Sequence, residues 1–404
     1  MRVLLLTYET PSYPGGGGAS RVHALIEPIA SRHRIRVIST GGPPALGKTP
    51  DNVDIRYVDP GPMLGPPDEG WLRKNVMHYL RAEPWLYRLA GHHVAAIASI
   101  IDEELRSFDP DVIAIVHEEL VPLLSRLPQE ARTAFEYQNF LLEVQRQNLR
   151  GKNSWETAKN VLELGVLARA ERRALRRATV SVVVSDPMVQ TARRLNRSAR
   201  VALIPNTVDL GYFTPHGSAD PKPTAVMTAS FHYPPNQEAT EELLSAVWPA
   251  VLARVPEAEL RLVGQNMPDE LRESAQAAAG VVVVGRVEDV RPELGRAWVA
   301  LAPLRKGSGS QLKVIEAFAM GVPVVGAPRV AEALRLGPDD GLLVGRSAAD
   351  MAARIVELLS DPAKRDRLGA TARRVVEERF DGARVAEDLE RVWLSAARPE
   401  RTRG

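Results

Sequence analysis

The chain has 404 residues, of which 45% are hydrophobic and 25% charged, proportions typical of a globular protein large enough for two domains. Its net charge of +2 gives no reason to expect nucleic acid as a partner, and its lack of cysteine excludes disulfides, thiolate metal sites and a cysteine nucleophile. Because no apolar run approaches the ~20 residues that span a bilayer, and the apolar N-terminal stretch is too short for a signal peptide, we expect a cytoplasmic protein.

Short apolar runs alternate with longer helical patterns along the first half, which indicates parallel α/β structure. The proline- and glycine-rich stretch 43–67 interrupts this pattern and holds at most one strand. Helices are predicted over 21–32, 71–89 and 92–107, and through the polar and basic segment that ends at Arg177. The predicted strands are 3–7, 35–39, 53–58, 111–116, 131–137, 180–184 and 201–204.

The second half repeats the alternation after a polar segment that we interpret as a linker. Its predicted strands are 225–228, 259–263, 281–284, 299–303, 323–326 and 342–344, and its main helices are 311–320, 348–359, 371–378 and 384–396. We therefore predict two Rossmann-like domains that face a deep ligand cleft at the carboxyl ends of their strands. The domains are 1–204 and 224–382, the linker is 205–223, and the helix in 383–404 is expected to pack back on the first domain.

The segment 302–325 carries the strongest indication of a ligand site. A buried strand ends, a glycine- and serine-rich loop follows, and a helix begins near Ser310. Glycines let the backbone approach a ligand closely, and the free N–H groups of a first helical turn favour an anion. Lys313 and Glu316 lie three residues apart and share one helix face. A cation for phosphates and a carboxylate for ribose hydroxyls would suit a nucleotide sugar, whereas the alternative is a surface ion pair on an ordinary amphipathic helix.

Several motifs make the chain resemble the retaining glycosyltransferases of family 4, which have two Rossmann-like domains in the GT-B arrangement, and most of all their sugar-transferase branch. The resemblance is dense in the second half and weak between about residues 43 and 177. It implies transfer of a glycosyl group from a nucleoside-diphosphate sugar to an acceptor hydroxyl, with retention at the anomeric carbon. The motifs are Tyr233-Pro234-Pro235-Asn236, Arg261-Leu262-Val263-Gly264, 285–290 and 307–325, with 14–21, Val184-Ser185 and 204–209 in the first half.

The resemblance implies that Glu316 binds the donor ribose, that Lys313 faces the diphosphate, and that the loop 285–290 lies along the base. Many members carry a glutamate eight residues before Glu316, where this chain has Ser308, so the donor sugar stays open. Many also place a basic residue near 230–232, a charge that Arg305 or Lys306 would supply here. The predicted donor-binding residues are Glu316, Arg305, Lys306, Gly307, Ser308, Gly309, Ser310, Gln311, Leu312, Arg286, Val287, Gly17 and Gly18, and the predicted catalytic residues are Lys313 and His117.

In the first half, the glycine run 15–18 follows the first strand, where the resemblance implies an approach to the diphosphate or the acceptor; the alternative is a flexible surface loop. It lacks the Gly-x-Gly-x-x-Gly spacing of a dinucleotide site. His117 ends a buried strand at the edge of the expected cleft, where the resemblance implies a contact with the donor sugar; the alternative is a strand-end histidine satisfied by hydrogen bonds. Glu118 and Glu119 are neighbours that point oppositely in an extended segment, so at most one faces the cleft as an acceptor-side candidate.

The histidines lack metal-ligand spacing, and arginine, lysine and helix amides would neutralise a diphosphate, so we expect neither a metal nor a cofactor. The five arginines within 169–177 form either a basic face for weak peripheral contact with anionic lipid or a solvated helix face, and we favour the solvated face.

The expected substrates are a UDP-, GDP- or dTDP-linked sugar and a small-molecule or glycan acceptor. Two alternatives stay open. One is a catalytically silent relative that binds a nucleotide sugar or a partner protein. The other is an enzyme of the same architecture that epimerises or couples its substrates without forming an ordinary glycoside. The oligomeric state does not follow from the sequence.

Overall fold

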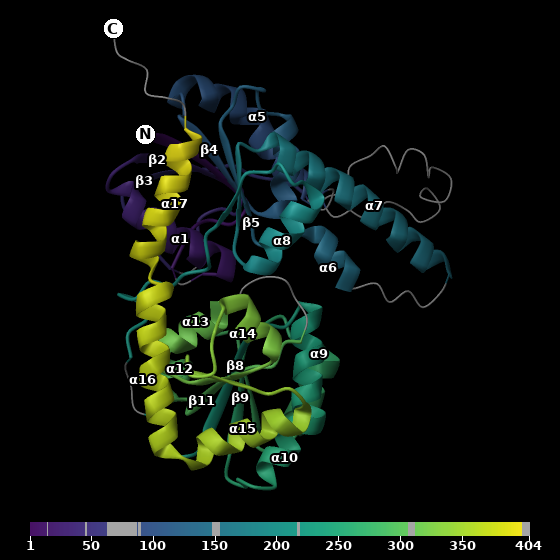
Figure 1. Cartoon of the computed structure of the whole chain (residues 1–404), viewed down its shortest axis with the longest axis vertical. Helices are drawn as coiled ribbons and strands as arrows, with labels where there is room; N and C mark the ends of the chain where they lie inside the picture. The colour runs from purple at the N-terminus through teal and green to yellow at the C-terminus, as the bar shows by residue number, and fades with distance from the viewer. Residues whose placement is uncertain are drawn as a thin grey trace. The chain divides into compact units, whose positions relative to one another are not determined.

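The computed structural model describes residues 1–13, 15–44, 47–62, 87, 90–147, 154–215, 219–305 and 312–397. The chain divides into two compact units. The first consists of Met1–Pro205 with Ala386–Gly404, and the second of Asn206–Val385. Each unit has a parallel sheet with helices packed around it (Figure 1). This is the α/β fold class predicted from the alternation of strands and helices.

The first unit is built on a sheet of seven parallel strands in the order β3-β2-β1-β4-β5-β6-β7. The order reverses between β1 and β4, which pair directly, with Leu6 beside Ile115. In open α/β sheets such a reversal is where ligands bind, outside the carboxyl ends of the strands. The strands are β1 (Arg2–Thr7), β2 (Arg34–Ser39), β3 (Val53–Tyr57), β4 (Val112–Val116), β5 (Thr133–Tyr137), β6 (Val180–Val183) and β7 (Val201–Leu203), each close to a predicted range.

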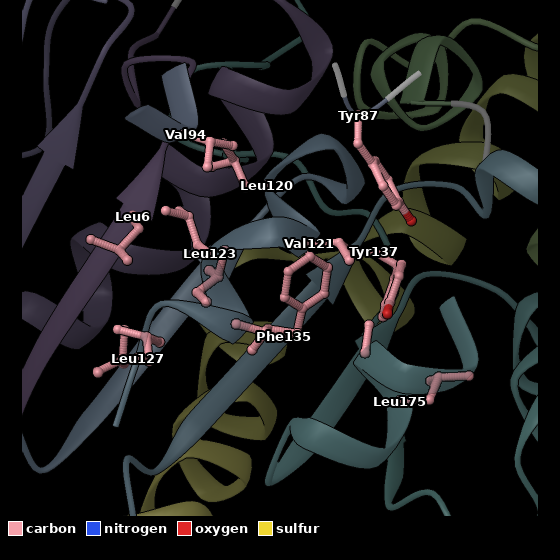
Figure 2. Packing of buried hydrophobic residues seen from close by; sticks show 14 of the residues in the cluster. Leu6, Tyr87, Val94, Leu120, Val121, Leu123, Leu127, Phe135, Tyr137 and Leu175 are labelled. Atoms are coloured by element: carbon pink, nitrogen blue, oxygen red, sulfur yellow. The ribbon is translucent and has the colours of Figure 1, made fainter. Parts of the chain in front are cut away.

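The helices of the first unit pack on this sheet around a large apolar core. Leu6 of β1, Phe135 and Tyr137 of β5, and Leu175 lie in that core (Figure 2). Apolar residues that recur on successive turns place one face of each helix against the strands. The helices are α1 (Gly17–Ala30), α5 (Gly91–Phe108), the 3₁₀ helix η1 (Glu118–Ser125), α6 (Leu141–Gln147), α7 (Ser154–Arg177), α8 (Asp186–Leu195) and the larger part of α17 (Gly382–Ala396).

Two of these elements differ from their predictions, and one prediction falls outside the described residues. The first helix begins at Gly17, four residues before the predicted start, so the end of the glycine run is helical and not a loop. The segment after β4 is a 3₁₀ helix and not an extended chain, which the sequence pattern did not indicate. The helix predicted over 71–89 lies outside the described residues, apart from Tyr87.

The C-terminal helix α17 carries Glu390, whose Oε1 lies 2.6 Å from Nε2 of His33, just beyond the end of α1. The same carboxylate also pairs with Arg32. These contacts lie within the first unit, to which residues 386–404 belong. Among the helices that the structure describes, none combines the length and apolar character needed to cross a membrane.

The second unit has six parallel strands in the order β10-β9-β8-β11-β12-β13, and this order reverses between β8 and β11. Helices surround the central strands (Figure 1). The strands are β8 (Thr224–Ser230), β9 (Glu259–Gln265), β10 (Val281–Gly285), β11 (Val299–Ala302), β12 (Val324–Gly326) and β13 (Leu342–Val344). The helices are α9 (Pro234–Glu242), the π-helical turn η2 (Leu243–Val247), α10 (Trp248–Leu252), α11 (Asp269–Ala277), α12 (Arg291–Arg296), α13 (Leu312–Ala319), α14 (Pro328–Leu334), α15 (Ala348–Ser360) and α16 (Pro362–Arg379).

Candidate functional site

The reversal of strand order in the second unit brings together the helices that follow β8 and β11. Lys313, in the first turn of α13, donates a hydrogen bond of 3.1 Å from Nζ to Oδ1 of Asn236 in α9. Asn236 is buried, and its Nδ2 donates to the carbonyl oxygen of Ser230 at the end of β8, at 2.8 Å. One amide side chain therefore fixes the Lys313 amine above the carboxyl end of the sheet.

Lys313 and Glu316 are both half-buried on α13. Burial lowers the pKa of Lys313 to about 8, although the neighbouring Glu316 acts to raise it. Burial also raises the pKa of Glu316 to about 7, although Lys313 acts to lower it. An amine and a carboxyl kept partly out of water are suited to a ligand that replaces the missing solvation, such as phosphate for the amine and hydroxyls for the carboxyl. This arrangement differs from a solvated surface ion pair.

The end of β8, which precedes the helix that carries Asn236, lies unusually close to β9. Gly264 has a φ of +147°, and a Cβ atom at this position would lie 1.7 Å from the carbonyl oxygen of Ala229. Gln237 adds a hydrogen bond of 2.7 Å from Nε2 to the carbonyl oxygen of Phe231. Only glycine permits this approach, so Gly264 of the Arg261–Gly264 motif has a direct structural role beside the candidate site.

The other residues predicted to bind the donor have varied surroundings. Arg305 follows β11 and forms an ion pair of 3.0 Å with Glu242, while its Nη1 donates to the carbonyl oxygen of Arg346 at 3.0 Å. Its charge is thus already engaged, and its role toward a diphosphate stays a prediction. Leu312 begins α13 and is half-buried. The predicted residues Lys306, Gly307, Ser308, Gly309, Ser310 and Gln311 lie outside the described residues.

Arg286 and Val287 follow β10, which is separated from β8 by β9. Arg286 is exposed and Val287 is half-buried. Arg291, the first residue of α12, pairs through its guanidinium with Asp289 of this loop at 2.7 Å and stacks 3.6 Å from the ring centroid of Tyr212. These contacts anchor the loop 285–290, whose predicted role along the base is not tested by the geometry.

The reversal in the first unit brings together the residues that follow β1 and β4. The rings of Tyr8 and His117 lie 4.3 Å apart between centroids. Nε2 of His117 lies 4.0 Å from Oε2 of Glu9, and within the described chain neither atom has a hydrogen-bond partner. His117 is buried with a φ of +83°, an uncommon backbone conformation for a residue other than glycine. Its burial lowers its pKa to about 3, with a further contribution from Arg21, so the imidazole is neutral at pH 7.

The start of α1 lies directly against this pair. A Cβ atom on Gly18 would lie 2.4 Å from Oε2 of Glu9 and 2.7 Å from Cε1 of His117. The Glu9 carboxylate accepts a hydrogen bond from the backbone N–H of Ala19, which acts to lower the pKa of Glu9 against the larger, raising effect of its burial. Glu9 therefore occupies the anion position at this helix N-terminus. Gly17 is exposed as the first helical residue, and the donor-binding role predicted for both glycines stays a prediction.

The structure separates the two adjacent glutamates after His117. The carboxylate of Glu118 accepts the backbone N–H of Gln138 at 3.0 Å, which ties it to the loop after β5. Burial raises the pKa of Glu118 to about 7, although hydrogen bonds from backbone N–H groups act to lower it. Burial raises the pKa of Glu119 to about 8, with further contributions from Glu118 and Glu9. Oε2 of Glu119 is buried without a hydrogen-bond partner in the described chain, so Glu119 is the acceptor-side candidate of the two.

Within the part of the chain that the structure describes, no group of three or more histidine, aspartate or glutamate side chains is arranged to hold a metal ion.

Arg172 donates to the carbonyl oxygen of Leu195 at 3.0 Å and Arg177 to that of Leu127 at 3.1 Å. Two of the arginines at the end of α7 therefore donate hydrogen bonds to backbone carbonyl groups of neighbouring segments.

Sequence reasoning missed Asn236 and Glu9 as site residues. Asn236 lies in the motif that begins at Tyr233. The available signal was a polar side chain in the first turn of a helix that follows a central strand. Glu9 follows the first strand as His117 follows β4, but nothing in the sequence shows that these two strands are neighbours.

Comparisons with known proteins identify relatives of both units. A family model described as "Glycosyl transferase 4-like domain" matches residues 16–207, and one described as "Glycosyl transferases group 1" matches residues 222–361. A phosphatidyl-myo-inositol mannosyltransferase of Mycolicibacterium smegmatis is 33% identical over 197 residues, which cover 47% of this chain and 50% of that protein. A GDP-mannose-dependent monoacylated alpha-(1-6)-phosphatidylinositol monomannoside mannosyltransferase of Corynebacterium glutamicum is 27% identical over 253 residues, covering 56% of this chain and 66% of that protein. The matches therefore span about half to two-thirds of these relatives.

Solved structures match nearly the whole chain. Sucrose-phosphate synthase from Thermosynechococcus elongatus has a TM-score of 0.73 at 18% identity, covering 98% of this chain and 99% of that chain. The Anabaena protein HepE in complex with UDP and glucose has a TM-score of 0.64 at 14% identity, covering 97% and 99%. At these identities the similarity establishes the fold and no more.

Proposed function

The chain belongs to the family 4 glycosyltransferases of the GT-B type, and we propose that it moves a glycosyl group from a nucleoside-diphosphate sugar to an acceptor hydroxyl. The observation that carries this proposal is the Lys313–Asn236 hydrogen bond, with Glu316 on the next turn of α13. It sets a cation and a carboxylate at the strand-order reversal of the second sheet, the common ligand position in such folds.

The donor is proposed to bind the second unit. Lys313 would pair with the diphosphate, and Glu316 would accept hydroxyls of the ribose. Two comparisons support a nucleotide sugar: one relative is named for its dependence on GDP-mannose, and one similar structure holds UDP and glucose. They point to different bases, so UDP-, GDP- and dTDP-linked sugars are all candidates.

The proposed reaction retains the configuration at the anomeric carbon and uses no metal ion. The bond between the anomeric carbon and the diphosphate oxygen breaks, and its electron pair stays on that oxygen. The acceptor oxygen bonds to the same carbon, and its proton passes to the departing phosphate. Lys313 stabilises the negative charge that develops on the diphosphate, which is the largest contribution expected of the protein. We assign no protein nucleophile.

The acceptor is proposed to bind the first unit, and His117, with its neutral imidazole beside Glu9, is proposed to contact the donor sugar as a catalytic residue. The curated relatives are named for phosphatidylinositol-type acceptors, and a small molecule or glycan is proposed here.

The test is a calorimetric titration of the full chain with UDP-, GDP- and dTDP-sugars, followed by assay of donor hydrolysis without acceptor. We expect one nucleotide to bind and its sugar to be released slowly. Lys313→Ala should lower turnover about a hundredfold with the melting temperature little changed. Lys222→Ala, at an exposed position of the same unit, is the matched control. Failure of all three donors to bind would contradict the proposal, and binding without turnover would favour the catalytically silent alternative.

A further inference from the structure

Exposed arginines gather toward the amino edge of the first sheet, on the segments that lead into β6 and β7. All eight are exposed, and no lysine occurs among residues 161–200. We call them the arginine face. They are Arg169, Arg172, Arg173 and Arg176 of α7, Arg193 and Arg194 of α8, and Arg197 and Arg200 before β7. The pairing of β6 with β7 brings the last four beside the arginines of α7.

Hydrogen bonds to backbone hold the segments of the arginine face together. Nε of Arg172 donates to the carbonyl oxygen of Leu195 at 3.0 Å, which joins α7 to the end of α8 (Figure 1). Nη1 of Arg200 donates to the carbonyl oxygen of Ser395 in α17 at 3.2 Å. Both acceptors are neutral, so these bonds fix the segments without neutralising either guanidinium charge.

The acids of these segments do not compensate the arginine face. Between residues 161 and 200 the acids are Glu163 and Glu171, which are buried, and Asp186, which lies at the opposite end of α8 from its arginines. Five guanidinium groups of the face form no ion pair within the described chain. They belong to Arg173, Arg176, Arg193, Arg194 and Arg197.

This charge pattern differs from that of a helix face that is merely solvated. Like charges one helical turn apart destabilise a helix, whereas mixed charges at that spacing stabilise it. Arg169 with Arg173, and Arg172 with Arg176, are like-charged pairs four residues apart. The charged residues of the adjoining segment 126–132 are two arginines and one glutamate, so this segment adds further positive charge. The fold of the single chain therefore gains nothing from this concentration of arginine.

The phosphate groups of an anionic bilayer match the arginine face. A planar guanidinium can donate two parallel hydrogen bonds to one phosphate, which an ammonium cannot. Each arginine near an anionic bilayer contributes about fivefold to partitioning, so three engaged arginines favour it about a hundredfold over a neutral bilayer. Single-stranded nucleic acid is a less suitable partner, because its binding relies on aromatic stacking and residues 161–200 contain no aromatic residue.

We propose that the arginine face docks the protein on a bilayer that contains anionic phospholipids. The arginines of α7 and α8 pair with lipid phosphates, and the carboxyl edge of the same sheet, which carries His117, points away from the contact. This reverses the preference for a solvated face that the sequence of α7 alone indicated. The inference goes beyond the proposed function, since it uses none of the residues assigned to donor or acceptor.

Vesicle sedimentation with the full chain tests the docking. Neutral phosphatidylcholine vesicles are compared with vesicles in which about 30% of the lipid is phosphatidylglycerol. At about 0.1 M salt we expect the anionic vesicles to bind about a hundredfold more tightly, and at about 1 M salt we expect this preference to disappear through screening. Equal binding to the two kinds of vesicle, or binding to neither, would overturn the inference. Release of the chain from anionic vesicles by a DNA duplex at equal phosphate concentration would also overturn it, by assigning the face to nucleic acid.

Two double variants locate the contact. Arg173→Gln with Arg176→Gln, on α7, should weaken binding to anionic vesicles about twentyfold. Arg193→Gln with Arg194→Gln, on α8, should weaken it by a similar factor, because both helices contribute to one face. Melting temperatures near that of the wild type would confirm that both variants fold. Wild-type vesicle binding in both folded variants would contradict the proposal.

The matched control is Arg34→Gln with Arg106→Gln, which removes the same charge from exposed positions of the same unit, on β2 and α5. This control should bind anionic vesicles nearly as well as the wild type. A loss as large as in the other two variants would show that net charge alone attracts the chain, against the inference. Calorimetry with nucleotide sugars on the same samples separates the two proposals, because absence of donor binding defeats the proposed function and leaves the docking surface untouched.

Discussion

Nζ of Lys313 lies 3.1 Å from Oδ1 of Asn236, and this hydrogen bond links the helices that follow two neighbouring strands, β8 and β11. An amphipathic helix packed on a sheet needs no such bond, because its stability comes from its apolar face. The bond holds an amine at a fixed place where a ligand is expected. Asn236 thereby becomes a positioning residue for Lys313, since its other amide atom is held by the carbonyl oxygen of Ser230.

Asn236→Ala should lower kcat about tenfold, because Lys313 loses the partner that orients it, with a smaller effect on the KM of the donor. Steady-state kinetics measure both constants. Gln237→Ala is the matched control, since Gln237 holds the same turn through the carbonyl oxygen of Phe231 without contacting Lys313. Equal losses in the two variants would show that Asn236 only supports the turn. Asn236→Asp, which keeps an oxygen for Lys313, should recover part of the lost turnover.

Glu316→Gln should weaken binding of the nucleotide sugar by about tenfold or more, because an amide accepts hydroxyl hydrogen bonds less strongly than a carboxylate. The pKa of Glu316 is raised to about 7 and that of Lys313 lowered to about 8, in both cases mainly by burial. Binding needs Glu316 ionised and Lys313 protonated, so nucleotide affinity should be greatest between about pH 7 and pH 8.

Calorimetry across pH 6 to 9 checks this expectation. The rise of affinity through pH 7 should vanish in Glu316→Gln, while Glu332→Gln, at an exposed position of the same unit, should behave as the wild type. Unchanged nucleotide affinity in Glu316→Gln would show that the donor site is elsewhere.

The sequence predicted the strands well because buried parallel strands are short, continuous apolar runs with turns at both ends. The run from Val112 to Val116 is an example, since all of its residues are buried. The order of the strands could not be predicted in the same way, because neighbours such as β1 and β4 are far apart along the chain. The pairing of Glu9 with His117 depends on that order, and so it emerged only from the structure.

The local conformation at site residues was also hard to predict. His117 has a positive φ, which the apolar run before it does not indicate, and a 3₁₀ helix follows it. This backbone turn separates the roles of Glu118 and Glu119. Alternation along a strand predicted only that their side chains point in opposite directions. In the second unit, by contrast, the spacing of Lys313 and Glu316 sufficed to place them on one helix face.

Gly264→Ala should destabilise the second unit by about 3 kcal/mol or more, because the added Cβ atom would collide with the carbonyl oxygen of Ala229 and the backbone has a positive φ. Urea unfolding followed by circular dichroism measures the change. Gly285→Ala is the matched control, since Gly285 has a φ of +79° and no atom within 4 Å of an added Cβ. It should cost only the backbone strain of about 1–2 kcal/mol. Similar costs for the two variants would argue against a close approach of β8 and β9.

Glu171 in α7 should make the stability of the first unit depend on pH. Its side chain is fully buried, accepts the backbone N–H of Leu142 at 3.1 Å, and has its pKa raised by burial to about 8. Between about pH 4.5 and pH 8 the folded chain keeps a proton that the unfolded chain releases. The contribution of Glu171 is therefore complete below pH 4.5 and is lost as the pH rises through 8.

Glu171→Gln should flatten this dependence, because glutamine stays neutral at every pH and still offers an oxygen to Leu142. Compared with the wild type, the variant should be similarly stable at pH 5 and more stable at pH 8, as measured by urea unfolding at both values. Glu130→Gln, exposed on the same unit, should leave the pH profile parallel to that of the wild type. Part of the slope should persist in Glu171→Gln, because burial also raises the pKa of Glu118 and of Glu119. If the profiles of Glu171→Gln and Glu130→Gln coincide, Glu171 is ionised in the folded chain at neutral pH and burial does not control its proton.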